Sequence, residues 1–198
     1  MPISREELFR LLDARLADPA IAVAQDAELW QRCAVARAIL VLDLSGFTRI
    51  TRARGILHFL AVYRRAMRLA CPLLETNHGR CVKLDADNVI GTFARVTDAL
   101  AAAQAIRQAT AETNRPLPPD DQVHVCQGVG FGTILELADD VYGDEVNIAF
   151  KLGEDVARAE QILVSEAAVA RLREEHGSVL DASHTIALGS VDIRYAHA

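Results

Sequence analysis

An uninterrupted apolar run that ends in a carboxylate limits most strongly how this chain can fold. Residues 36–43 read ARAILVLD, and the uninterrupted apolar run within them is 38–42. Ser45 and Gly46 follow after Leu44, before a segment of good helix-forming residues. A short apolar run bounded by turn residues is typical of a strand that is buried on both faces. The sequence therefore predicts a central strand over 36–43 with a helix after it, and places Asp43 at the end of the strand.

Hairpins and helices alternate along the rest of the chain. The elements predicted after this strand are, in order, a long helix over 56–74, a β-hairpin over 80–93 with its turn at 85–88, a helix over 98–114, two strands separated by a glycine-rich break over 123–137, a strand, a helix and one or two short tail strands. This order predicts an α+β fold of the ferredoxin-like βαββαβ type, a mostly antiparallel sheet with helices packed on one face.

The N-terminal segment is predicted to form a helical extension. Ser4 and Glu7 have the spacing of a capping box, which begins a helix that continues to about Ala17. Residues 24–35 predict a second helix. We therefore expect two parts, a helical extension over 1–35 and a domain over 36–198.

Composition argues against several classes of function. The 198 residues are 51% apolar and carry a net charge of −6, so a soluble globular protein without a nucleic-acid-binding face is expected. No apolar run approaches the roughly 20 residues that cross a bilayer, and the N-terminus has no signal-peptide core, so no membrane partner is expected. The four cysteines form no C-x-x-C pair, which predicts reduced thiols in a cytoplasmic protein.

Two acids stand where they could share a cation. Asp43 closes the buried strand and Asp87 lies in the hairpin turn, so neighbouring strands of one sheet would bring them together. Close carboxylates repel each other unless a cation lies between them, and open oxygen sites favour Mg²⁺ or Mn²⁺. Free N–H groups after Ser45 and Gly46 would suit a phosphate. Spacing alone favours a plainer interpretation, in which Asp43 caps a helix and Asp87 is a turn residue.

Three blocks in order resemble the class III nucleotide cyclase catalytic domain, the adenylate and guanylate cyclase homology domain. They are LDLSGFT at 42–48, VKLDADNVIGTF at 82–93, and GVGFG at 128–132 with DVYGDEVNIAFKL at 140–152. The resemblance covers about residues 36–168 and implies the fold of that family. It also implies conversion of ATP to 3′,5′-cyclic AMP and pyrophosphate with two Mg²⁺ or Mn²⁺ ions per site. In the family each site is shared between two subunits, so a homodimer with two sites is implied.

The resemblance implies a role for each residue that matches the family pattern. The metal-binding positions are Asp43, Asp87 and the backbone carbonyl of Leu44, and the substrate-binding positions are Ser45, Gly46, Phe47, Lys83 and Asp140. Asn147 matches the asparagine that orients the ribose, and Lys151 stands at the position that contacts the phosphates in the transition state. Lysine can donate to adenine N1 and aspartate can accept from the exocyclic amine, so Lys83 with Asp140 favours ATP.

Lys151 departs from the family pattern, which usually has an arginine there. Lysine keeps the charge but loses the planar, bidentate fork, so low activity is expected. The tail offers no lysine for the family's second phosphate contact, and Arg194 is the candidate replacement. These departures leave two alternatives open: a degenerate homologue that binds nucleotide or dimerises as a regulatory module, and a cyclase for another nucleotide. The N-terminal helices are then candidates for docking a regulatory partner.

Overall fold

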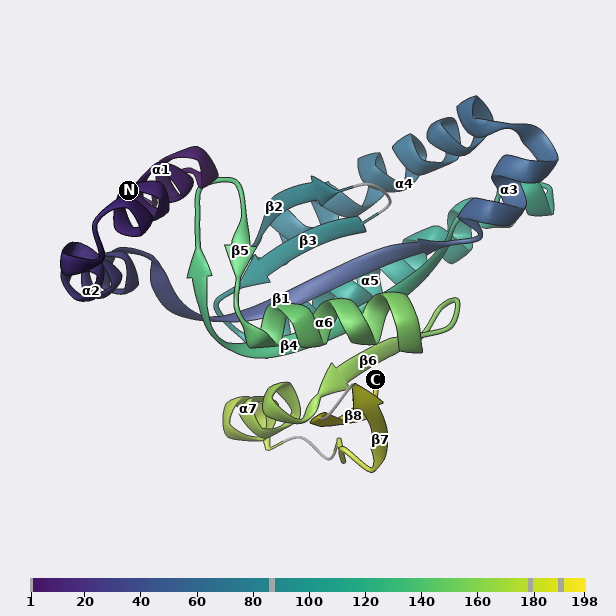
Figure 1. Ribbon diagram of the computed structural model, residues 1–198. Coiled ribbons are helices and arrows are strands. Elements are labelled where there is room, and N and C mark those ends of the chain that lie inside the picture. Colours follow the sequence, from purple (N-terminus) through teal and green to yellow (C-terminus); the bar gives the residue numbers. More distant parts are fainter. Residues whose placement is uncertain (1, 86–87, 178–179, 189–190) are drawn as a thin grey trace.

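The computed structural model describes residues 2–85, 88–177, 180–188 and 191–198 (Figure 1). The strands are β1 Ala34–Ser45, β2 Gly79–Asp85, β3 Asn88–Phe93, β4 His124–Glu136, β5 Val141–Tyr142, β6 Ile162–Ser165, β7 His184–Leu188 and β8 Val191–His197. The helices are α1 Arg5–Ala17, α2 Ala22–Cys33, α3 Phe47–Arg54, α4 Ile56–Thr76, α5 Val96–Asn114, α6 Asp144–Phe150 and α7 Glu166–His176. Short helical turns are η1 Pro19–Ile21, η2 Pro119–Asp121 and the π-helical η3 Lys151–Val156. None of the helices in the described ranges is long and apolar enough to cross a membrane.

The predicted central strand is confirmed as β1, which is longer than expected. The sheet order is β2-β3-β1-β4-β6-β8-β7, with β5 paired to β4, so β1 has a hydrogen-bonded neighbour on each side. The described strand pairs are antiparallel except β4–β6, which is parallel. Leu40 and Val41 are completely buried. The continuous apolar run thus reflects a strand that is covered on both faces.

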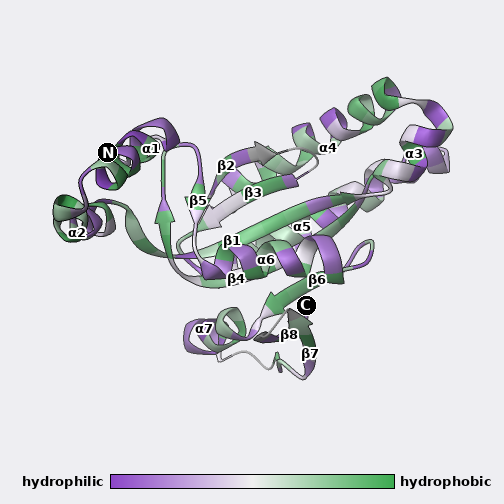
Figure 2. Cartoon of the chain, viewed as in Figure 1, coloured by the Kyte–Doolittle hydropathy of each residue, from purple (hydrophilic) through white to green (hydrophobic). Residues whose placement is uncertain are grey.

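Helices cover both faces of the sheet, which corrects the expected one-sided layout. Successive residues of a strand point to opposite faces, so Leu40 and Leu42 join a core formed with α4, α5 and α7. Val41 points the other way and packs with residues of α6. Figure 1 shows α6 in front of the sheet and α4 and α5 behind it. Figure 2 shows hydrophobic colouring along β1 between the two layers.

The glycine-rich break predicted within 123–137 is wrong, because β4 is one continuous strand through these glycines. Gly128 and Gly130 lie beneath α6. A Cβ added to Gly128 would overlap the carbonyl oxygen of Ala149, and one added to Gly130 would lie 2.6 Å from the carbonyl oxygen of Glu145. Glycine at alternate positions therefore lets the backbone of α6 approach the backbone of β4, rather than ending the strand.

The two N-terminal helices pack against the end of the β4–β5 hairpin. The side chain of Ser4 accepts a hydrogen bond from the N–H of Glu7 at 3.1 Å, which confirms the predicted start of α1. A small core joins the helices to the hairpin loop; it consists of Ile3, Leu8, Leu29, Cys33 and Leu137. Figure 1 shows the helix pair at one end of the sheet. Because β1 begins at Ala34, residue 35 lies in a strand, and the division into two parts stays a prediction.

Gly128→Ala is expected to destabilise the fold by about 1–3 kcal/mol or more, because the new methyl group would meet backbone atoms that cannot rotate away. Gly91→Ala is the matched control: its Cβ would meet the side chain of Leu74 at 3.1 Å, and that side chain can adjust. Urea unfolding of both variants measures the difference. A loss for Gly128→Ala no larger than that for Gly91→Ala would contradict the packing argument.

Candidate functional site

The candidate residues of β1 and β2 lie on the face of the sheet that α6 covers. Asp43 is two residues from Val41 and therefore points to the same face. Lys83 is paired with Ile90, which belongs to the same core as Val41. The opposite face is filled by α4, α5 and α7, which leaves the α6 face for chemistry.

Lys83 and Asp140, predicted to select the purine, form an ion pair. The ammonium of Lys83 lies 3.3 Å from Oδ2 of Asp140, which is only 7% exposed. Two neighbours also donate to this carboxylate, the N–H of Val141 to Oδ1 at 2.9 Å and the hydroxyl of Tyr142 to Oδ2 at 3.1 Å. Burial, and then the charge of Asp140, raise the pKa of Tyr142, so its hydroxyl keeps its proton and donates. The pair thus presents a fixed donor beside a fixed acceptor.

Asn147 and Lys151 lie one helical turn apart where α6 continues into η3. Asn147 is exposed and Lys151 is partly buried. Lys151 forms an ion pair with Asp155, four residues further on, which the sequence analysis did not include. A π-helical segment is a rare backbone form that occurs often at functional sites. The two predicted residues therefore share one helix face, with the charge of Lys151 already partnered by an acid.

Asp43 lies two residues before the end of β1, among polar neighbours; the strand continues past the end predicted from the sequence. Asp43 is half-buried, opposite Asn88 on β3 and Cys126 on β4. Burial, and then the negative charges of Asp43 and Glu160, raise the pKa of the Cys126 thiol to about 11. Asn88 donates to Glu154 at 2.5 Å, and its own Oδ1 is buried with no hydrogen-bond partner in the described part of the chain. Carboxylate and amide oxygens therefore gather at this end of β1.

Asp87, the second predicted metal ligand, lies outside the described residues. Among the residues that the structure describes, no three or more histidine, cysteine or acidic side chains cluster as a metal site. The pairing of Asp43 with Asp87 therefore stays a prediction.

The turn after Asp43 begins a helix that no side chain caps. Gly46 is the N-cap residue of α3 and has φ +100°, a left-handed conformation that favours glycine. Phe47 is 43% exposed and meets the ring of Phe59 edge-on, 4.7 Å between centroids. Ser45 and Leu44 are still paired with β4. The predicted phosphate-binding turn thus lies next to Asp43.

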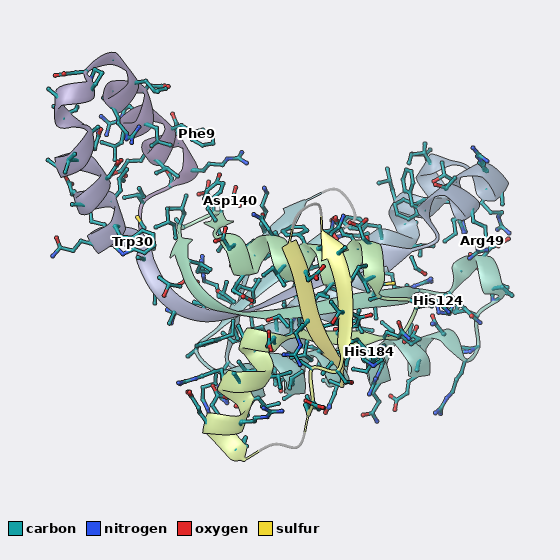
Figure 3. All side chains as sticks on the ribbon, turned by 60° about the horizontal axis from the view of Figure 1, so that its bottom comes forward. Phe9, Trp30, Arg49, His124, Asp140 and His184 are labelled. Atoms are coloured by element: carbon teal, nitrogen blue, oxygen red, sulfur yellow. The ribbon has the colours of Figure 1, made fainter. Side chains whose placement is uncertain are left out.

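Asp140 and the group around Asp43 lie toward different ends of the sheet. Ser45 is paired with His124, so the Asp43 group lies at the start of β4. Asp140 follows the end of β4. Figure 3 shows Asp140 beside the helices that carry Phe9 and Trp30, and His124 toward the other end of the sheet.

Comparison with known proteins identifies relatives for both the sequence and the fold. No protein-family model matches the chain. A curated protein of Rhizobium meliloti (strain 1021), named "Putative adenylate cyclase 3", is 34% identical over 116 residues, which are 58% of this chain and 20% of that protein. The chain thus spans about a fifth of the length of this curated relative.

Two solved structures share the architecture over 83% of this chain. The adenylate/guanylate cyclase/hydrolase of Silicibacter pomeroyi has a TM-score of 0.67 at 24% identity, over 96% of its own chain. The adenylyl cyclase CyaB of P. aeruginosa has a TM-score of 0.69 at 16% identity, over 94% of its own chain. This chain has the class III nucleotide cyclase fold. The α+β fold class and the family resemblance seen in the sequence are thereby confirmed.

In this cyclase fold, an ionic network that sequence reasoning missed supports the loop before Asp140. Arg80 donates to the carbonyl oxygens of residues 137–138, each at 2.9 Å, and to Glu136 at 3.0 Å. Glu136 also accepts from Thr92 at 2.6 Å and from Arg37 at 2.9 Å. Burial alone would raise the pKa of Glu136, but the hydrogen bonds from Thr92 and Arg80 and the charge of Arg37 lower it overall. The only sequence signal was one charged residue of the network in each of three strands, β1, β2 and β4.

Arg194, the candidate replacement for the missing tail lysine, is not brought to the other candidate residues of the cyclase fold. It lies on β8 and pairs with Glu166 at the start of α7, at 2.5 Å, while a second nitrogen donates to the carbonyl oxygen of Ala182. Strands β6 and β4 separate β8 from β1 in the sheet order. Its assignment to this chain's phosphate site is therefore not supported by the geometry.

A cavity of about 630 Å³ among the described residues of the cyclase fold lies away from these groups. It is lined by residues at the start of β1 and β2, among them Ala34, Gly79 and Glu136. None of the predicted site residues lines it.

Glu136→Gln is expected to destabilise the protein most at neutral pH. Because the folded-state pKa of Glu136 is lowered, its contribution is fully present above the unfolded-state pKa of about 4.3 and is lost as the pH falls through the folded-state pKa. Urea unfolding at pH 7 and pH 3.5 should show a penalty that shrinks in acid. Glu166→Gln, which removes an exposed ion pair, is the control and should change stability little at either pH. An equal penalty for Glu136→Gln at both values would refute the electrostatic role.

Proposed function

We propose that this chain is a nucleotide cyclase that converts ATP to 3′,5′-cyclic AMP and pyrophosphate. The observation that carries the proposal is the Lys83–Asp140 pair, two residues 57 positions apart that meet at 3.3 Å. Such a pair places a hydrogen-bond donor beside an acceptor, as recognition of a purine base requires. The cyclase names of the sequence relative and of the structural neighbours support the same reaction.

The chemistry of this pair favours adenine. The ammonium of Lys83 can donate to adenine N1, and the carboxylate of Asp140 can accept from the exocyclic amine. Guanine presents an acceptor at O6 and a donor at N1, so it would leave both groups facing the wrong partner. A buried polar group left unpaired is costly, which supports selection of ATP over GTP.

The residues around Asp43 fit divalent metal ions. The carboxylate of Asp43, the backbone carbonyl of Leu44 and the unpartnered oxygen of Asn88 are oxygen donors of the kind that Mg²⁺ and Mn²⁺ prefer. Asp87 is proposed as a further ligand. Such ions, when bound, lower the pKa of a ribose hydroxyl and neutralise phosphate charge.

The remaining candidate residues are proposed to bind and orient the substrate. We infer that Asn147 orients the ribose and that Lys151 donates to the phosphates, one helical turn further on. The N–H groups at the uncapped start of α3, after Gly46, would donate to a phosphate oxygen. Lys151 must exchange Asp155 for the phosphates, which weakens its contribution and supports a slow enzyme.

The distribution of these residues supports a site shared by two copies of the chain. Asp140, the acceptor of the base-recognising Lys83–Asp140 pair, and the Asp43 group lie toward different ends of the face that α6 covers. In a two-fold symmetric dimer, the Asp43 group of one copy would face the base-recognising pair of the other. A homodimer with two such sites is therefore proposed.

A second candidate is a non-catalytic module that binds nucleotide or dimerises. It is favoured by one observation, the lysine at position 151 with its charge held by Asp155. The oxygen donors near Asp43 argue for the enzyme. Incubation with each of the four nucleoside triphosphates and Mn²⁺ or Mg²⁺, followed by chromatography, decides between them. Cyclic AMP from ATP is expected, and a folded protein that yields no cyclic product from any of the four would sink the enzymatic proposal.

Asp43→Asn is expected to abolish turnover and to weaken Mn²⁺ binding, because it removes the charge that holds the ion. The fold should survive, since the amide has nearly the same size and shape as the half-buried carboxylate. Cyclic AMP production, Mn²⁺ binding by calorimetry and thermal unfolding give the three measurements. Asp13→Asn, an exposed acid on α1, serves as the control. Wild-type turnover and wild-type Mn²⁺ affinity in Asp43→Asn would show that no ion binds at this position.

Lys151→Arg is expected to raise kcat more than it lowers KM, because a bidentate fork matters mainly in the transition state. The gain is about ten-fold if one charge-assisted bond of about 1.4 kcal/mol is restored. Lys151→Ala should lower kcat by a similar factor. Steady-state kinetics with ATP measures both. Should Lys151→Ala turn over ATP as fast as the wild type, Lys151 takes no part in the reaction and the non-catalytic alternative gains.

A further inference from the structure

The start of α1 lies directly against the loop that carries Asp140. The N–H of Ala138 donates to the carbonyl oxygen of Ile3 at 2.8 Å, and the N–H of Arg5 donates to Oδ1 of Asp139 at 2.7 Å. The guanidinium of Arg5 reaches further and lies 3.5 Å from Oδ2 of Asp140. Three contacts made by Ile3 and Arg5 therefore join the N-terminal segment to this acidic loop.

Buried apolar contacts hold the start of the N-terminal segment against the loop that carries Asp140. Ile3 is 2% exposed and packs with Leu8 and with Leu137, the residue just before the loop. Arg5 is the first residue of α1, where a positive side chain is unfavourable because the helix dipole is also positive there. Asp139 and Asp140 supply the negative charge that offsets both the arginine and the dipole. An arginine at this position is thus accounted for by the two acids it meets.

Oδ2 of Asp140 is crowded with donors. Lys83 lies at 3.3 Å, the hydroxyl of Tyr142 at 3.1 Å and Arg5 at 3.5 Å. An incoming amine must displace one of them. Tyr142 is two residues away on the same loop, and Lys83 is itself assigned to the base. Arg5 is 48% exposed and makes the longest of the three contacts, so it is the donor most easily displaced.

We propose that Arg5 is a further residue of the base-recognition site, where it competes with the exocyclic amine of the purine for Asp140. Docking of α1 then lowers the affinity for an adenine nucleotide, and displacement of Arg5 raises it. This inference rests on the proposed function, because it takes Asp140 as the acceptor for the base. It makes the N-terminal segment a determinant of substrate affinity, with no contact of its own to the substrate.

The test compares Arg5→Gln with Arg10→Gln, an exposed arginine on the same helix, in the full chain. The probe is an ATP analogue with a methylene group between the α- and β-phosphates, and its Kd is measured by calorimetry in the presence of Mn²⁺. Arg5→Gln should bind it about two- to five-fold more tightly than the wild type, the range expected for a partly exposed ion pair. Arg10→Gln should bind the analogue with the Kd of the wild type. Arg5→Lys keeps the charge, so its Kd should also be close to that of the wild type.

A double-mutant cycle shows whether Arg5 acts through Asp140. In the Asp140→Asn background the gain from Arg5→Gln should disappear, whereas a merely structural effect of Arg5 would persist. Unchanged or weaker binding in Arg5→Gln, with an unchanged thermal midpoint, overturns the inference while leaving the proposed function standing. A wild-type chain that binds neither the ATP analogue nor its guanine counterpart removes the proposed function, and this inference with it.

Discussion

The burial of β1 on both faces is the constraint on which the rest of the structure depends. A strand with apolar side chains on both sides must lie at the centre of a sheet with a layer on each face. The helices α4, α5 and α7 form one layer, and α6 forms the other. Strict alternation then decides that Asp43, two residues after Val41, faces the α6 side. The position of one acid thus follows from the burial of its own strand.

The second layer is held by an unusually close approach of two backbones. The glycines of β4 leave no side chains beneath α6, and a Cβ added to Gly153 of η3 would lie 3.3 Å from the carbonyl oxygen of Val41. Asn147 and Lys151 are carried by this same helical segment. The placement of both residues therefore depends on glycines that take no part in chemistry.

Local patterns predicted much of the fold but little of the site. The apolar run of β1, the helical spacing within α4 and the capping box at Ser4 were sufficient, because each is encoded by neighbours in sequence. The glycines of β4 were misinterpreted as a break, since glycine is unfavourable in a strand unless a second backbone must come close. The pairing of Lys83 with Asp140 was expected only through the family resemblance. No local period encodes a contact between residues so far apart in sequence.

The same limit explains the residues that were missed. Glu136, Asn88 and Arg5 each act through partners on other strands or helices, and none has a distinctive neighbourhood in the sequence. Asp155 was missed although it is only four residues from Lys151, because a charged pair at that spacing is common on helix surfaces. A charged pair at this spacing indicates a function only when one of its two residues has already been assigned a role.

The direct packing of α6 on the glycines of β4 has a mechanical consequence. With no side chains between them to rotate, the strand and the helix cannot slide past one another and must move as a single rigid body. Asp140 is attached to the end of that strand, and Lys151 follows that helix. The distance between Asp140, proposed to meet the base, and Lys151, proposed to meet the phosphates, is therefore held constant. In the proposed function, this fixed separation favours ligands whose base and phosphates are the same distance apart.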